Sequence, residues 1–329
     1  MRRRSAAFTL VELLVATVIL GVVMVSVLGT MVTTQKKAAS VEDTVDVQQT
    51  ARQIADIIER DLRHTGMLVE DAASICGTDR RTSPDSFTVS NWEAVQPGSD
   101  LRPSLGAELI GATGLPANGT FFSVDSVVLE QATPSPAFDT DGNGVADSDF
   151  AVNGGVIVAD AANPGRGAAC GIVTGVNPPS QLRVSLDTGA LSPVTVGMET
   201  PRIVAVPAIR YSVGVDGVLS RGGLPLAGDV EDLQLAWFED ADTDNVVDLG
   251  EYKGDGVGAD YAAASTNASN LREIRLSIVL RTRDAEPELA TGNPVATENR
   301  TVVAQNDGFR RRVYTSVVRL RNLGRRVQL

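Results

Sequence analysis

The residues best suited to chemistry in this sequence are carboxylates gathered in one loop. At positions 1, 3, 5, 9 and 12 of a calcium-type loop, the sequence has Asp240, Asp242, Asp244, Asp248 and Glu251. In such loops position 7 adds a backbone carbonyl, here that of Val246, and the last acid adds two oxygens. Position 6 is Asn245, and Asn is the next-best residue after glycine for a left-handed turn. The loop therefore predicts a Ca²⁺ site, and the alternative is a solvated acidic turn.

A second acidic loop follows the same pattern in its first half only. Its candidate ligands are Asp139, Asp141, Asn143, Val145 through its carbonyl, and Asp147, with Gly144 at position 6. The last position is Phe150, so the bidentate acid is missing. This loop predicts either a weaker Ca²⁺ site or a turn rich in glycine and aspartate.

Other side chains offer little chemistry. The single histidine, His64, excludes mechanisms that need two, and the sequence has no nucleophile elbow, phosphate loop or zinc-protease motif. The formal net charge of −12 argues against nucleic acid as a partner. Cys76 and Cys170 are the only cysteines. In an oxidising compartment we expect a disulfide between them, and in a cytosol two buried thiols.

The elements that would position these groups begin with an apolar segment. Residues 13–35 carry no charge and are long enough to span a bilayer as a helix. The arginines at 2–4 precede this span, so the positive-inside rule places the N-terminus in the cytoplasm. The small residues at 5–7 lie before the apolar stretch, whereas in an ordinary secretory signal they follow it. Glu12 stands at the head of the apolar run, where a carboxylate is costly and usually functional.

Residues 8–13, Phe-Thr-Leu-Val-Glu-Leu, resemble the start of mature type IV pilins and type II secretion pseudopilins. The resemblance implies that a prepilin peptidase cuts between Ala7 and Phe8, and that the new amine of Phe8 is methylated. The family usually has glycine where this chain has Ala7. The resemblance also implies that Glu12 pairs with the N-terminal amine of a neighbouring subunit, which would neutralise the carboxylate in lipid. The alternative is an uncleaved single-pass anchor.

Beyond the apolar segment the sequence predicts an amphipathic helix. Charged residues fill its other faces, and the predicted buried stripe comprises Val41, Val45, Ala51, Ile54, Ile58 and Leu62. No proline interrupts residues 8–66, so one helix is predicted over this range. Gly66 is suited to cap its C-terminus.

The remaining sequence predicts a β-rich head. The predicted strands are 123–130, 155–160, 182–186, 202–215, 230–238, 271–283 and 310–321. Alternation in the last two is typical of an antiparallel sheet with one face on the core and one in water. Residues 78–116 are predicted to be mainly loop. The fold class is therefore α+β and type IV pilin-like: a long N-terminal α-helix, transmembrane and then amphipathic, packed on a large antiparallel-sheet head.

Two further segments narrow the resemblance. Residues 59–66, followed by Cys76, resemble the helix end of PilW-type minor pilins and of the larger GspJ-type pseudopilins. Residues 310–322 resemble the final strand of PilW-type proteins. The implied domains are a leader at 1–7, a transmembrane or filament-core half-helix at 8–35, an amphipathic half-helix at 36–66, and a head at 67–329.

The resemblance implies a non-enzymatic structural subunit, a minor pilin or pseudopilin that primes or caps a type IV pilus or type II secretion pseudopilus. It would insert into the bacterial inner membrane with its head in the periplasm and then enter a filament that can reach the cell surface. Its partners would be the prepilin peptidase and other major and minor pilins or pseudopilins. One alternative is a calcium-dependent adhesin displayed on a pilus. Another is a membrane-tethered enzyme, for which the sequence has no motif.

Overall fold

The computed structural model describes most of the chain. The described residues are 9–67, 69, 71–90, 107–108, 112–113, 124–130, 150, 152–177, 181–189, 191–242, 244, 246, 248, 251–253, 261–262, 268–285, 295–301 and 307–323. The chain divides into two compact units, Met1–Val47 and Gln48–Leu329.

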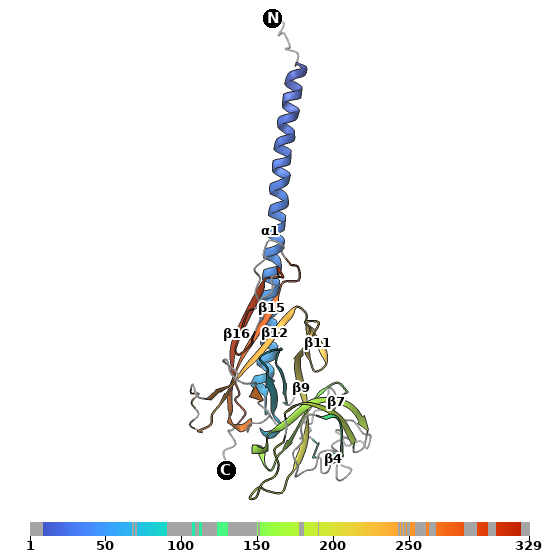
Figure 1. Ribbon diagram of the computed structural model, residues 1–329, viewed down its shortest axis with the longest axis vertical. Helices are drawn as coiled ribbons and strands as arrows, with labels where there is room; N and C mark the ends of the chain where they lie inside the picture. Colours follow the sequence, from blue (N-terminus) through green and yellow to red (C-terminus); the bar gives the residue numbers. More distant parts are fainter. Residues whose placement is uncertain are drawn as a thin grey trace. The chain divides into compact units, whose positions relative to one another are not determined.

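A single helix, α1 (Leu10–His64), runs through the first unit and into the second (Figure 1). It confirms the continuous helix predicted from the absence of proline between residues 8 and 66. Gly66 follows the helix with φ at 77°, the left-handed conformation that glycine adopts without steric cost. The predicted C-cap is therefore confirmed.

The predicted buried stripe of this helix is only partly correct. Ile58 and Leu62 are fully buried, and Ala51 and Ile54 nearly so. Val41 and Val45, however, are exposed. Both valines belong to the first compact unit, Met1–Val47, whereas these four buried positions belong to the second. Helical periodicity identified the apolar face, but it could not show which positions on that face are buried.

The larger of two sheets is antiparallel throughout its described pairings, and its main path runs in the order β14-β1-β2-β9-β6-β7-β8-β5-β4. β10 pairs with β9 and β11, and β3 pairs with β9. The strand bounds are β1 (Ile75–Asp79), β2 (Ser86–Val89), β3 (Ala107–Glu108), β4 (Ala112–Thr113), β5 (Val124–Glu130), β6 (Gly155–Asp160), β7 (Ala168–Asn177), β8 (Gln181–Gly189), β9 (Ile203–Val213), β10 (Leu219–Arg221), β11 (Leu224–Ala227) and β14 (Tyr261–Ala262).

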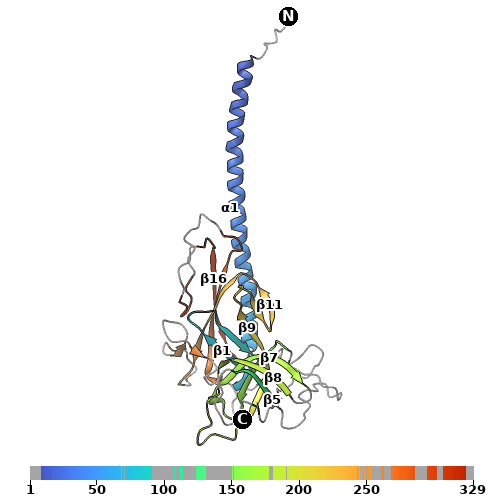
Figure 2. The same cartoon turned by 45° about the vertical axis from the view of Figure 1, so that its right-hand side comes forward.

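The smaller sheet has the order β13-β12-β15-β16 and is also antiparallel. Its strands are β12 (Val230–Glu239), β13 (Tyr252–Lys253), β15 (Leu271–Arg281) and β16 (Arg311–Arg319). β16 lies beside the lower part of α1 in both ribbon views (Figures 1 and 2). One face of β12 and β15 is apolar and buried, with Leu235, Trp237, Ile274 and Leu276 all fully covered. The alternation predicted for residues 271–283 thus has its apolar face in the core.

All seven predicted strands are present, but the sequence missed several others. β2 lies inside the stretch predicted to be mainly loop, and all four of its residues are buried. β7 was missed because glycines interrupt its apolar pattern. At Gly171 an added Cβ would lie 1.9 Å from the carbonyl oxygen of Ser185 on β8, so that glycine permits the close approach of the two strands.

Candidate functional site

The start of α1 is built by a reciprocal pair of side chains. The Thr9 N–H and hydroxyl each donate to Glu12 Oε2 at 3.0 Å, and the Glu12 N–H donates to Thr9 Oγ1 at 3.3 Å. This is a capping box, in which threonine at the N-cap and glutamate three residues later satisfy each other's backbone donors. Glu12 therefore has a structural partner within its own chain, which the sequence analysis did not foresee.

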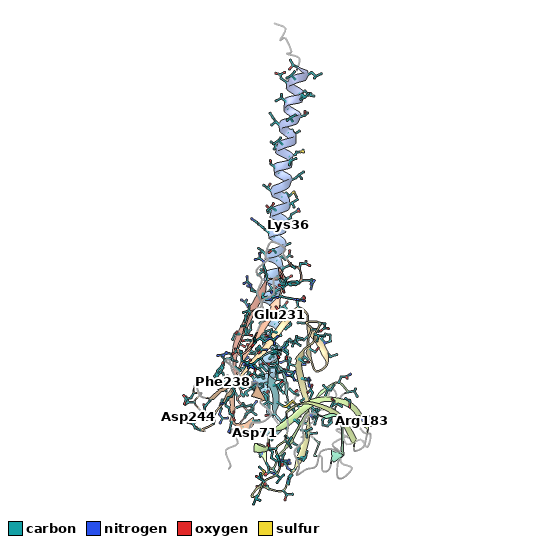
Figure 3. The ribbon with its side chains drawn as sticks, in the orientation of Figure 1. Lys36, Asp71, Arg183, Glu231, Phe238 and Asp244 are labelled. Atoms are coloured by element: carbon teal, nitrogen blue, oxygen red, sulfur yellow. A yellow bond between two sulfur atoms is a disulfide. The ribbon has the colours of Figure 1, made fainter. Side chains whose placement is uncertain are left out.

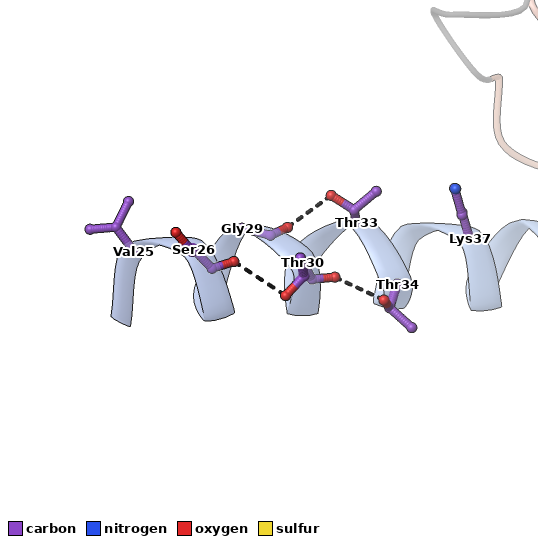
Figure 4. A pocket seen from close by; sticks show the side chains of 7 residues that line it. All are labelled: Val25, Ser26, Gly29, Thr30, Thr33, Thr34 and Lys37. Carbon is purple, nitrogen blue, oxygen red and sulfur yellow. Dashed lines mark hydrogen bonds between the residues drawn. The ribbon is translucent and has the colours of Figure 1, made fainter. Parts of the chain in front are cut away.

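The apolar part of α1 also contains hydroxyl groups, and these bond to their own helix. Around a shallow hollow lined by Val25, Gly29 and Lys37, the hydroxyls of Thr30, Thr33 and Thr34 donate to carbonyls four residues earlier (Figure 4). A hydroxyl satisfied in this way does not need water, which suits a lipid or protein environment. By length and composition, α1 is able to cross a membrane.

A buried carboxylate anchors the second half of α1 to the larger sheet. Asp61 is fully buried and accepts a hydrogen bond from the Tyr211 hydroxyl of β9 at 2.6 Å. The Arg221 guanidinium of β10 reaches the same carboxylate at 2.8 Å. Burial, together with the negative charge of Asp61, raises the pKa of Tyr211. The ring of Tyr211 stacks on Phe87 of β2 with centroids 4.8 Å apart. Asp61 thus joins the helix directly to β9 and β10, and through the ring of Tyr211 to β2.

The end of α1 is closed by residues from the far end of the chain. Asn322 Nδ2 donates to the carbonyls of Arg63 and Thr65 at 3.2 and 3.1 Å. These are carbonyls that a helix terminus leaves without internal partners. Leu323 packs against Gly66, where an added Cβ would lie 2.5 Å from Leu323 Cδ2. The helix terminus and the segment after β16 therefore form one packed corner.

Cys76 and Cys170 form a disulfide, as predicted for an oxidising compartment, with their Cα atoms 6.2 Å apart. It connects β1 to β7, and both cysteines are buried in an apolar cluster with residues such as Ile157 and Val206. The disulfide therefore lies in the core of the larger sheet.

A fully buried ion pair lies at the end of β6. Arg166 Nη1 donates to Asp160 Oδ2 at 2.6 Å, and neither side chain is exposed. Asp160 also accepts from Asn163 Nδ2 and from the Arg202 N–H. Burial alone would raise the pKa of Asp160, but the hydrogen bonds from Arg166, Asn163 and Arg202 outweigh it and lower that pKa. No periodicity or motif in the sequence indicated this pair.

The structure brings three of the predicted calcium ligands together. One carboxylate oxygen from each of Asp240, Asp242 and Asp244 lies within 4.8 Å of the others. Asp240 is buried at the end of β12, and the other two are exposed on the following loop. Asp244 is on the periphery of the head, on the loop that follows the strand of Phe238 (Figure 3). Three carboxylates in this arrangement are a suitable donor set for a hard cation.

The other predicted ligands of this loop have different partners. Glu251 accepts the N–H of Ala241 at 2.6 Å through Oε1 and the N–H of Asp248 at 3.2 Å through Oε2. The hydrogen bonds from Asp248 and Ala241 lower the pKa of Glu251. The Asp248 side chain is exposed, and the Val246 N–H donates to Asp244 Oδ1. The predicted bidentate acid thus holds the two ends of the loop together.

Asp240 also has a cationic neighbour. The Arg272 guanidinium of β15 lies 2.8 Å from Asp240 Oδ2. A cation bound by the three aspartates would share that carboxylate with an arginine, which reduces the negative charge available to it.

Two predicted sites lie outside the described residues. They are the cleavage position at Ala7 and Phe8, and the second acidic loop with Asp139, Asp141, Asn143, Val145 and Asp147. Both stay predictions.

Two family models match the chain. The prokaryotic N-terminal methylation motif matches residues 2–28, and the type IV pilus-assembly protein W family matches residues 208–322. The second match covers β12, β15 and β16 entirely and begins well before the closing segment that carried the sequence resemblance. No curated protein matches the chain. A solved type IV-like pilin from Thermus thermophilus covers 84% of this chain and 98% of its own at 12% identity, but its TM-score of 0.34 is too low to support an argument.

The long apolar helix, the antiparallel head and the methylation motif are the features expected of the type IV pilin class. Over residues 208–322 the chain is similar to the type IV pilus-assembly protein W family. The motif and the apolar helix fit a membrane-anchored pilin.

Proposed function

We propose that this chain is a minor pilin that primes or caps a type IV pilus. A type II secretion pseudopilus is the alternative filament. The observation that supports this most directly is the methylation motif on an apolar helix that carries one acid, Glu12, at its start. A head spanning residues 48–329 as one compact unit is large for a subunit that repeats along a shaft, which favours a terminal position.

Processing and orientation follow from the same proposal. The prepilin peptidase cuts after Ala7, Phe8 is methylated, and the head lies in the periplasm before assembly. The role of the chain is structural, with no catalytic step assigned to it.

Glu12 has two roles in this proposal. In the single chain it caps α1 through Thr9. In the filament its carboxylate also meets the N-terminal ammonium of a neighbouring subunit, because an acid in an apolar environment needs a charge partner. The two roles require different properties of the side chain, because capping needs an oxygen acceptor and pairing needs a negative charge.

Three variants separate these roles. Glu12→Gln keeps an oxygen for the cap and removes the charge, Thr9→Ala weakens the cap and keeps the charge, and Glu12→Ala removes both. Filament number per cell and incorporation of the chain into sheared filaments are the measurements. We expect Glu12→Gln to reduce both as strongly as Glu12→Ala, and Thr9→Ala to reduce them little. Normal assembly with Glu12→Gln would refute the pairing role.

Deletion of the gene tests the priming role itself. We expect filament number to fall sharply while the major subunit is still made. Unchanged filament number with loss of surface attachment would refute priming and support the adhesin alternative.

We also propose that residues 240–251 bind Ca²⁺. The support is the clustering of the oxygens of Asp240, Asp242 and Asp244. The pairing of Asp240 with Arg272 and the use of Glu251 as a loop clasp lead us to expect weak affinity, in the range of extracellular calcium modules at about 10⁻⁴–10⁻³ M. Calorimetry of the full chain in detergent should show binding that Asp242→Ala with Asp244→Ala abolishes and Asp46→Ala leaves intact. Equal heats for all three proteins would remove calcium from the function.

A further inference from the structure

We propose that the free edge of β16 binds an extended strand of a different polypeptide, with β-branched residues at its centre and acidic residues at both ends. β16 is the last strand of the smaller sheet in the described part of the chain. It pairs with β15 without a register shift from Glu273↔Arg319 to Arg281↔Arg311. A regular edge strand offers a row of backbone donors and acceptors to another chain.

The devices that usually protect such an edge are absent from the middle of β16. The strand has no proline, no bulge and no charge between Arg312 and Arg319. Its exposed central residues are Val313, Thr315 and Val317, with Val313 39% and Val317 52% exposed. β-branched side chains on an exposed strand favour cross-strand pairs with similar residues. These three residues therefore predict β-branched residues at the centre of the partner strand.

The inner side of the same strand makes the edge firm. Val318 is buried on the inner face, and on the exposed face Thr315 shares a hydrogen bond of 3.0 Å with Ser277 on β15. Tyr314 faces α1, where burial, together with the carboxylates of Glu59 and Asp56, raises its pKa. A strand held in this way keeps its outward backbone groups in fixed positions, which lowers the entropy that binding must overcome.

Charge specifies the ends of the binding segment. The chain carries −12 overall, yet residues 310–321 contain five arginines and no acid. Arg311 is neutralised by Glu231 and Asp307, and Arg319 pairs with Glu273. Arg312 and Arg321 are exposed and have no ion pair among the described residues. One lies at the start of the strand and the other just after its end, so acidic residues at both ends of a partner strand would complement them.

The same charges argue against a second copy of this chain. In an antiparallel pair of β16 strands, Arg312 of one copy would lie near Arg319 or Arg321 of the other, and in a parallel pair each arginine would lie near itself. Like charges opposite each other on neighbouring strands are destabilising. The inference rests on the proposed function, since it supplies a specific contact between unlike subunits.

The test uses the full chain in detergent and a fluorescent peptide, Glu-Glu-Thr-Val-Thr-Val-Thr-Glu-Glu, with a second peptide that has lysine in place of each glutamate. We expect the acidic peptide to bind about tenfold more tightly or better. The double change Val313→Lys with Val317→Lys should abolish that binding, while Val196→Lys with Val215→Lys, at exposed sites on loops, should not. Arg312→Glu with Arg321→Glu should reverse the preference. Thermal unfolding confirms that each variant is folded.

Equal binding of both peptides, no binding, or survival of binding in the Val313→Lys and Val317→Lys protein would overturn the proposal. A dimer of the full chain that this double change dissolves would also overturn it, because the occupant would then be a second copy. A chain that binds no peptide but is still needed for filaments refutes the strand pairing alone. A chain that binds the acidic peptide but whose deletion leaves filaments unchanged refutes the proposed function alone.

Discussion

The hydroxyl of Tyr211 lies 2.6 Å from the carboxylate of Asp61, 150 residues earlier in the chain. The contact is buried, and Arg221 completes it from β10. The apolar stripe packs α1 against the head without fixing its register. The polar contact fixes the register, because it pairs the helical turn at Asp61 with β9 and β10. Its removal should weaken the attachment of the helix to the head.

Asp61→Ala is expected to destabilise the second compact unit by about 3 kcal/mol, because Tyr211 and Arg221 lose their shared buried partner. Asp61→Asn, which keeps an oxygen for the Tyr211 hydroxyl, should lose less. Urea unfolding of the full chain in detergent measures both. Asp56→Ala, an exposed change one helical turn and one residue earlier, is the matched control and should have little effect. Equal losses at positions 56 and 61 would contradict the anchoring role.

The Asp160–Arg166 pair predicts a pH dependence. The folded state lowers the pKa of Asp160, so ionised Asp160 stabilises the fold above its unfolded pKa of about 3.9. That stability is lost as the pH falls through the folded pKa. The difference in melting temperature between the wild type and Asp160→Asn should therefore be constant near neutral pH and shrink below about pH 4. With Asp46→Asn, an exposed change, no such trend is expected. A constant difference down to pH 2 would show that Asp160 does not titrate in this way.

The Cys76–Cys170 bond closes a long loop, with a sequence separation of 94. Loop-closure entropy predicts that replacing both cysteines with alanine lowers the free energy of unfolding by about 4.7 kcal/mol. Because both sulfurs are buried, a mild reductant should not reduce the disulfide of the native wild-type protein. If the protein is unfolded and refolded in the reductant, the disulfide should be lost and the free energy of unfolding should fall. Thiol labelling before and after unfolding measures access. Rapid labelling of the reduced native protein would argue against the buried position.

Gly66→Ala is expected to lower the free energy of unfolding by more than the strain of its left-handed backbone alone. A left-handed residue other than glycine costs about 1–2 kcal/mol, and the new Cβ would also collide with Leu323. Gly222→Ala, at φ 57° with no atom within 4 Å of its Cβ, should show the backbone cost only. In a double-mutant cycle, Leu323→Ala should recover part of the loss at Gly66. Additive effects of the two changes would mean that the corner is not packed as described.

The sequence predicted the elements with strong periodicity and missed the contacts between distant residues. The apolar run, the helix through Leu62 and the alternating strands β15 and β16 each follow a local pattern, so each was found. β2 and β7 are short or interrupted by glycine, and their strand character comes from neighbours that bury them. The local sequence of a strand does not show which other strands will pack beside it.

The candidate site divides in the same way. The spacing of Asp240, Asp242 and Asp244 predicted a cluster that the structure brings together. The spacing could not show that Arg272, on another strand, approaches Asp240, or that Glu251 closes the loop through backbone N–H groups. Thr9 was detectable, because threonine three residues before Glu12 is the pattern of a capping box. Asp61 and Tyr211 were not, because nothing local connects positions 150 residues apart.

The cap that Asn322 places on the carbonyls of Arg63 and Thr65 joins positions 259 and 257 residues apart. A ribosome delivers the helix long before it delivers that asparagine. During synthesis the carbonyls of Arg63 and Thr65 therefore lack the hydrogen bonds from Asn322, and Gly66 lacks its contact with Leu323. The corner forms only after Asn322 and Leu323, which follow β16, have been synthesised and have packed against the end of α1. A chain whose synthesis stops before Asn322 therefore lacks this cap on the end of α1.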